Sequence, residues 1–188
     1  MVMNFDIRYV GDYDVSAFLD TVNTFTDSQW DEWQQRKGSN NPHNDVRSIP
    51  LKWCLKVPEY HPSLTDEENG LVYGPLYLRC REFLDEIHQI IDSVDGPGKP
   101  VTAILANLPA GKTITPHIDT PGLGLFTHCK RYHVVLQTHL DVGFYYNGVR
   151  HHMERGTIHE LNNTDGQHGV DNPSSVDRIH LITDRSCA

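Results

Sequence analysis

The spacing of hydrophobic residues divides the chain into a partly helical first half and a second half of short strands. Between residues 14 and 36, apolar side chains recur every three or four positions, which predicts one or two amphipathic helices. The same spacing from 75 to 94 predicts a helix that ends before the turn sequence DGPGKP. The segment 47–57 alternates in part and predicts a strand that breaks near Pro50, after a loop at 38–45.

Beyond residue 100, short runs rich in β-branched and aromatic residues alternate with turn signals. Such spacing is typical of a β-sandwich or barrel. We therefore expect a mainly β protein with N-terminal helices, in which a helical and mixed part (1–99) packs on an antiparallel β core (100–186) in one domain. The runs that carry this prediction are VTAILANL, YHVVLQTHL, VGFYYNG, GTIHEL and RIHLITD.

Composition excludes several classes of protein. The chain has 188 residues, of which 25 are acidic and 16 are basic, and its net charge of −9 argues against nucleic acid as a partner. No apolar run approaches the roughly 20 residues that span a bilayer, and no secretory signal is visible at the start. The scattered cysteines predict free thiols and a cytoplasmic location: Cys54, Cys80, Cys129 and Cys187.

The twelve histidines make a histidine-based metal site worth testing. In TPHIDTPG, His117 and Asp119 are two residues apart, so on an extended strand their side chains leave the same face. His168 follows 49 residues after Asp119. An HxD pair with a remote histidine is the sequence form of the 2-His-1-carboxylate triad of non-haem Fe(II) oxygenases. A lone HxD pair is weak evidence, because histidine and aspartate are both common in this chain.

A third element is Arg178, ten residues after His168 and at the start of the β-like run RIHLITD. The planar fork of arginine binds carboxylates bidentately, so a buried Arg178 near the metal would hold an anionic co-substrate. On spacing alone, an exposed arginine on an edge strand is an equally good interpretation. Arg131, in KRYHVVLQT, is a second candidate of the same kind.

At this point four ordered motifs resemble a known family. The stretch 104–186 resembles the aspartyl/asparaginyl β-hydroxylases, which are Fe(II)- and 2-oxoglutarate-dependent oxygenases. The resemblance covers a little under half of the chain, and four motifs in order are more specific than one HxD pair. They are LPAGKTITPHID, RYHVVLQT, GTIHELNNTDGQHGVDN and DRIHLITD.

The resemblance implies a fold and roles for particular residues. It implies a double-stranded β-helix core, of the jelly-roll or cupin type, in which His117 and His168 bind iron. Arg178 matches the arginine that pairs with the distal carboxylate of 2-oxoglutarate. Arg131 and His133, in an RxH motif, match positions that line the co-substrate near its metal-bound end.

Asp119 departs from the best-known animal members, which have glycine at this position and use only two histidines. Because the carboxylate is present here, we expect a full set of metal-binding and catalytic residues, His117, Asp119 and His168. Whether Asp119 binds the metal directly or through water is left open. A glycine-containing loop beside this motif, TPGLGLF (120–126), is expected to be flexible and could cover a substrate.

The resemblance implies a dioxygenase that uses Fe(II), 2-oxoglutarate and O2 to hydroxylate an amino-acid side chain of the Asp/Asn type, free or in a peptide or protein. Its co-products would be succinate and CO2. Two alternatives stay open: a cupin-type metalloenzyme that does not use 2-oxoglutarate, and a non-catalytic module that binds metal or 2-oxoglutarate. No membrane partner is expected, and the sequence predicts neither the substrate's identity nor an oligomeric state.

Overall fold

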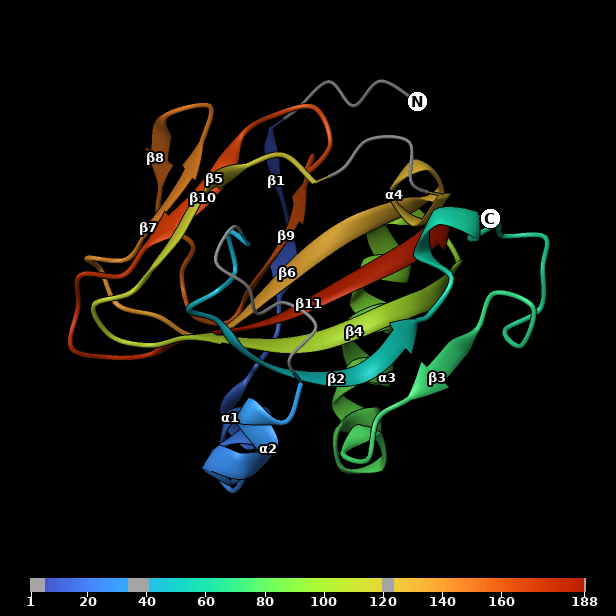
Figure 1. Ribbon diagram of the computed structural model, residues 1–188, viewed down its shortest axis with the longest axis horizontal. Helices are drawn as coiled ribbons and strands as arrows, with labels where there is room; N and C mark the ends of the chain where they lie inside the picture. The colour runs from blue at the N-terminus through green and yellow to red at the C-terminus, as the bar shows by residue number, and fades with distance from the viewer. Residues whose placement is uncertain (1–5, 34–40, 120–123, 188) are drawn as a thin grey trace.

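Two antiparallel β-sheets face each other and form the body of the protein (Figure 1). The computed structural model describes residues 6–33, 41–119 and 124–187. The larger sheet has seven strands, in the order β1 (Ile7–Asp12), β9 (Thr157–Leu161), β6 (Cys129–Gln137), β11 (Arg178–Cys187), β4 (Gly98–Leu108), β2 (Arg47–Cys54) and β3 (Leu71–Tyr73). The smaller sheet has four, in the order β5 (Thr113–His117), β10 (His168–Asp171), β7 (Gly143–Tyr146) and β8 (Val149–His151).

A hydrophobic core fills the space between the two sheets. Alternate side chains of each strand point inward, so both sheets contribute to one buried cluster. This arrangement is a jelly roll, and it confirms the predicted mainly β fold. The cluster includes Ala106, Val135 and Ile182 from the larger sheet and Ile114, Phe144 and Val170 from the smaller one.

The helices cover the outer face of the larger sheet (Figure 1). The predicted helical segments hold α1 (Ser16–Val22), α2 (Asp27–Asp31) and α3 (Tyr77–Asp95). The buried face of α3 recurs every three or four residues, and the helix ends at Gly96, whose φ of 78° glycine adopts readily. Two short helices complete the fold, η1 (Val57–Glu59) and α4 (Gly124–His128).

The first part of the chain contributes strands as well as helices. β1 pairs with β9, and β2 pairs with β4, so segments from both halves of the chain build the larger sheet. The predicted loop at 38–45 is a turn over 41–45, and 38–40 lie outside the described residues. Residues 120–123 of TPGLGLF also lie outside them, and 124–126 belong to α4, so most of the predicted flexible loop falls outside the described residues.

The predicted break at Pro50 is wrong, because β2 runs through this residue. Pro50 lies opposite Ile104 of β4, and the register shifts between Pro50 and Lys52. The other neighbour, β3, begins to pair only at Lys52. Proline has no N–H to donate, and at Pro50 the strand has a sheet neighbour on one side only, so the missing donor is tolerated.

Cys54, Cys80 and Cys129 are buried, and none of the three is in a disulfide within the described residues. None of the helices in the described ranges is long and apolar enough to cross a membrane.

Candidate metal and co-substrate site

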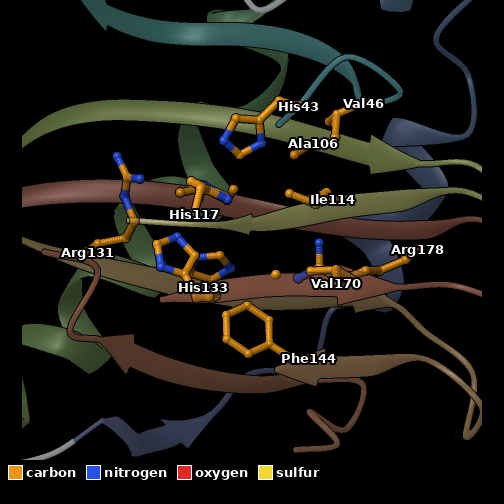
Figure 2. Close-up of a pocket in the computed structure, with 13 residues that line it drawn as sticks. His43, Val46, Ala106, Ile114, His117, Arg131, His133, Phe144, Val170 and Arg178 are labelled. Carbon is orange, nitrogen blue, oxygen red and sulfur yellow. The ribbon is translucent and has the colours of Figure 1, made fainter. Parts of the chain in front are cut away.

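A cavity that opens to solvent lies between the sheets. Histidines and arginines form the polar part of its lining, and aliphatic and aromatic side chains form the rest. Figure 2 shows His43 above His117, with Arg131 and Arg178 on opposite sides of the cavity. The lining residues are His43, Val46, Ala106, Ile114, His117, Arg131, His133, Phe144, His168, Gly169, Val170, Arg178 and Ile182.

The register of the smaller sheet brings His117 and His168 together. They lie directly opposite each other on β5 and β10, and their ring centroids are 4.4 Å apart. The Nδ1 atom of His117 lies 2.9 Å from the carbonyl oxygen of Thr115, and that of His168 lies 3.2 Å from the carbonyl of Gly166. A carbonyl can only accept, so both Nδ1 atoms carry the hydrogen. This leaves both Nε2 lone pairs free for a metal.

Asp119 brings one of its oxygens close to His117. Its Oδ1 lies 3.6 Å from Nε2 of His117. Its Oδ2 accepts hydrogen bonds from Nη1 of Arg131 and, at 2.7 Å, from Nδ2 of Asn163. Burial alone would raise the pKa of Asp119, but the charge of Arg131 and the Asn163 amide outweigh it and hold the pKa below its ordinary value. Asp119 is therefore an anion that can provide one oxygen to a metal.

A third histidine, His43, lies at the same place and was missed by sequence reasoning. The ligand atoms of His43, His117 and Asp119 all lie within 4.8 Å of one another. The ring of His43 meets that of His117 edge-on at 4.7 Å. His43 belongs to a turn whose end is anchored by the buried Val46, since the N–H of Val46 donates to the carbonyl of His43 at 2.9 Å. No spacing in the sequence links this turn to the HxD motif.

Arg178 is buried in the cavity wall, only 2% exposed. Its Nη2 donates to Nδ1 of His180 at 2.9 Å, and no carboxylate of the described residues forms an ion pair with it. Burial lowers the pKa of Arg178 to about 9, so the guanidinium is still charged at neutral pH. An uncompensated buried cation is costly unless an anion joins it. The wall of the cavity thus offers a site for an anionic group.

His133 lies on the same face of β6 as Arg131 and lines the cavity. It is 5% exposed, and its Nδ1 has no hydrogen-bond partner within the described parts of the chain. Burial, followed by the charge of Arg178, lowers the pKa of His133 well below its ordinary value. His133 is therefore a neutral imidazole that can donate to, or accept from, a ligand in the cavity.

Arg131, unlike Arg178, already has anionic partners. Its Nε and Nη2 donate to the two carboxylate oxygens of Asp184 at 2.7 and 2.9 Å, and its Nη1 donates to Asp119. Burial would lower the pKa of Arg131, but the charges of Asp184 and Asp119 outweigh it and raise the pKa. The family resemblance predicts a place for Arg131 near the co-substrate, and no motif in the sequence assigns a role to Asp184.

The side chains fit an Fe(II) ion and a dicarboxylate co-substrate. Two neutral imidazoles and a carboxylate are the ligand set of the facial triad, which leaves open positions for further ligands. The Nε2 atom of His117 is buried and has no hydrogen-bond partner among the described residues, as expected for a ligand atom. Arg178 supplies the positive charge that a carboxylate needs.

Together the jelly-roll fold and this set of side chains define the class of 2-oxoglutarate- and Fe(II)-dependent oxygenases. A family model described as aspartyl/asparaginyl beta-hydroxylase matches residues 77–186, which is more than half of the chain. The chain belongs to this family, and membership implies dependence on Fe(II) and 2-oxoglutarate. No curated protein is a significant match.

Several solved structures have a similar fold. A 2OG-Fe(II) oxygenase family protein from Burkholderia pseudomallei has a TM-score of 0.60 at 12% identity, over 96% of this chain and 84% of that one. A prolyl hydroxylase from Trichoplax adhaerens, in complex with a peptide of hypoxia inducible factor, has a TM-score of 0.61 at 12% identity, over 97% and 84%. A Pseudomonas putida prolyl-4-hydroxylase has 0.53 at 11%, over 98% and 94%. At these identities the likeness shows the fold alone.

Proposed function

We propose that the protein hydroxylates an amino-acid side chain, with Fe(II) held by His117, Asp119 and His168 and with 2-oxoglutarate anchored on Arg178. One observation carries the proposal. The cavity combines a cluster of metal-ligand side chains with a buried arginine that has no carboxylate partner in the described chain. A metalloenzyme without an anionic co-substrate would have no use for this cation.

The protein's own residues would hold and orient the reactants. The hydrogen bonds from the Nδ1 atoms of His117 and His168 to backbone carbonyls fix the two rings with Nε2 toward the metal. Arg178 would take the distal carboxylate of 2-oxoglutarate, because its charge is otherwise uncompensated. His133, neutral and with its Nδ1 lacking a partner in the described structure, would form a hydrogen bond to the co-substrate.

The bound metal supplies the oxidising chemistry, in which O2 and 2-oxoglutarate are consumed, succinate and CO2 are released, and a C–H bond is hydroxylated. The protein's aliphatic and aromatic wall, with Ile114, Phe144 and Val170, would keep stray water away from this reaction.

For the substrate we propose an amino-acid side chain of the Asp/Asn type, free or within a peptide or protein. The name of the family supports the residue type. The peptide bound to the prolyl hydroxylase from Trichoplax adhaerens shows that a protein of this fold can accept a peptide, which supports the broader substrate class.

A spectroscopic titration tests the metal and co-substrate sites together. Protein loaded with Fe(II) without oxygen should develop a metal-to-ligand charge-transfer band on addition of 2-oxoglutarate. His117→Ala and His168→Ala should not develop it, whereas His139→Ala should, because His139 is 44% exposed and lies outside the cavity. Absence of the band in the wild-type protein would refute the proposal.

The substrate is then sought by an O2-dependent succinate assay. Free amino acids and a peptide pool are offered to the loaded protein, and products are examined for the mass of one added oxygen. If succinate release is not stimulated by any aspartyl or asparaginyl compound, the proposed substrate class is wrong.

A further inference from the structure

We propose that Arg131 is a positioning residue for the metal-binding carboxylate, and that a buried Asp184–Arg131 pair sets the orientation of Asp119. This role differs from the co-substrate contact expected from the family resemblance. It rests on the proposed function, since Asp119 is taken to bind the metal.

The larger sheet places the buried Asp184–Arg131 pair and a threonine next to it in one row. Arg131 of β6 lies directly opposite Asp184 of β11, and Asp184 lies directly opposite Thr102 of β4. Directly opposed residues on paired strands project from the same face of a sheet. Three neighbouring strands therefore present a threonine, a carboxylate and a guanidinium side by side.

Hydrogen bonds leave Asp184 and Arg131 little freedom. Thr102 donates its hydroxyl to Oδ2 of Asp184 at 2.7 Å. Arg131 then binds both oxygens of Asp184 in the bidentate geometry given above. Thr102, Arg131 and Asp184 are all buried, at 0%, 6% and 1% exposure. A buried pair with these contacts is a rigid support.

Asp119 meets this support from the segment that follows β5, two residues beyond the end of the strand. Both hydrogen bonds to its side chain, from Arg131 and Asn163, go to Oδ2. The backbone N–H of Asp119 donates to the carbonyl of Asn163 at 3.0 Å, which ties the main chain to the same neighbour. Oδ1 is left facing Nε2 of His117. The arrangement selects binding of the metal through one oxygen.

The balance of charge separates the two arginines. Arg131 is matched by the carboxylates of Asp184 and Asp119, while Arg178 has none among the described residues. Of these two arginines, only Arg178 therefore has a guanidinium charge available to an anionic ligand in the cavity. Loss of Arg131 should affect the metal first, and loss of Arg178 should affect 2-oxoglutarate first.

Separate titrations of Co(II) and 2-oxoglutarate test this division. Asp184→Asn and Arg131→Gln should weaken Co(II) binding by about 10- to 100-fold, as is usual when a partner of a metal ligand is removed. They should also change the visible spectrum of bound Co(II), which reports its coordination. Once Co(II) is saturating, their affinity for 2-oxoglutarate should stay within about threefold of wild type. A threefold change in Kd is less than the tenfold change that corresponds to 1.4 kcal/mol of binding free energy.

Arg178→Met serves as the matched control with the opposite pattern, an unchanged Co(II) affinity and a large loss of 2-oxoglutarate affinity. Circular dichroism and thermal unfolding show whether each variant folds. If Arg131→Gln unfolds because Asp184 is left as an unpaired buried charge, the double variant Arg131→Met/Asp184→Leu removes the pair together and is titrated instead.

Two results overturn the proposal: Arg131 and Asp184 variants that bind Co(II) as wild type does, or that lose 2-oxoglutarate affinity at saturating Co(II). Wild-type protein that binds Co(II) but not 2-oxoglutarate would overturn the proposed function. If the Arg131 and Asp184 variants still bind Co(II) more weakly in that case, the positioning role of Arg131 would nevertheless be supported. Wild-type protein that binds no Co(II) would overturn both.

Discussion

Replacing Arg178 with methionine should make the ligand-free protein more stable and should reduce the stabilisation that 2-oxoglutarate gives. Burial lowers the pKa of Arg178 from its ordinary value to about 9, which corresponds to about 5 kcal/mol of unfavourable free energy for the buried charge. Methionine fills similar space without a charge. It leaves Nδ1 of His180 without its donor, at a cost of about 1–3 kcal/mol. The net expectation is a gain of about 2–4 kcal/mol.

Ligands should narrow this difference in stability. A ligand at 100 times its Kd stabilises the folded protein by about 2.7 kcal/mol. Without the guanidinium, a carboxylate in the cavity loses about 2–5 kcal/mol of pairing, so 2-oxoglutarate should bind at least about 30-fold more weakly. Urea unfolding with and without Mn(II) and 2-oxoglutarate measures both effects. The exposed Arg155 offers a control, and Arg155→Met should change neither quantity.

The pH dependence of the ligand-free protein gives an independent check. Burial lowers the pKa of Arg178 to about 9 in the folded protein, whereas the unfolded chain keeps the ordinary, higher pKa, so the unfolded state binds more protons above about pH 9. The stability of the wild type relative to Arg178→Met should therefore rise as the pH increases above about 9. A methionine variant that is less stable without ligands and binds 2-oxoglutarate normally would refute the reasoning.

Three further variants test other parts of the structure. His43→Ala should weaken Co(II) binding by about tenfold or less, because three ligands remain, and a titration in which it equals the loss in His117→Ala would contradict this. Gly169→Ala should cost about 1–3 kcal/mol in urea unfolding, since a Cβ there would lie 2.8 Å from the backbone oxygen of Ile114. Burial, followed by nearby positive charges, lowers the pKa of His88 to about 4. The unfolded state therefore binds this proton more tightly, and up to about 3 kcal/mol of stability should be lost as the pH falls from 6.5 to 4. His88→Leu should lose less over this range, and equal slopes would argue against it.

Local patterns in the sequence predicted the elements that depend on local interactions. The helical spacing of 75–94 is a property of one segment, and α3 is found there. The HxD pair and the remote His168 were found by spacing, but their meeting depends on the register of β5 with β10. Spacing along a chain cannot give that register.

The parts that were missed depend on partners far away in the chain. β1 carries no strong pattern of its own, and it exists as a strand because β9 pairs with it. In the sequence, Asp184 is the last residue of the run RIHLITD and belongs to no motif. Only the register of β11 with β6 shows that it lies opposite Arg131. His43 lies in a turn that only the folded chain brings over His117.

The position of β11 has a consequence for how the protein is made. It follows all the other strands in the chain, yet it lies in the middle of the larger sheet, between β6 and β4. On the ribosome, β4 and β6 therefore emerge with unpaired edges, which invite association with other chains until residues 178–187 arrive. The same strand carries both Arg178 and Asp184. A nascent chain consequently cannot form the co-substrate contact or the support of Asp119 before β11 has paired with β4 and β6. The ability to bind ligands and the protection from aggregation are therefore acquired together.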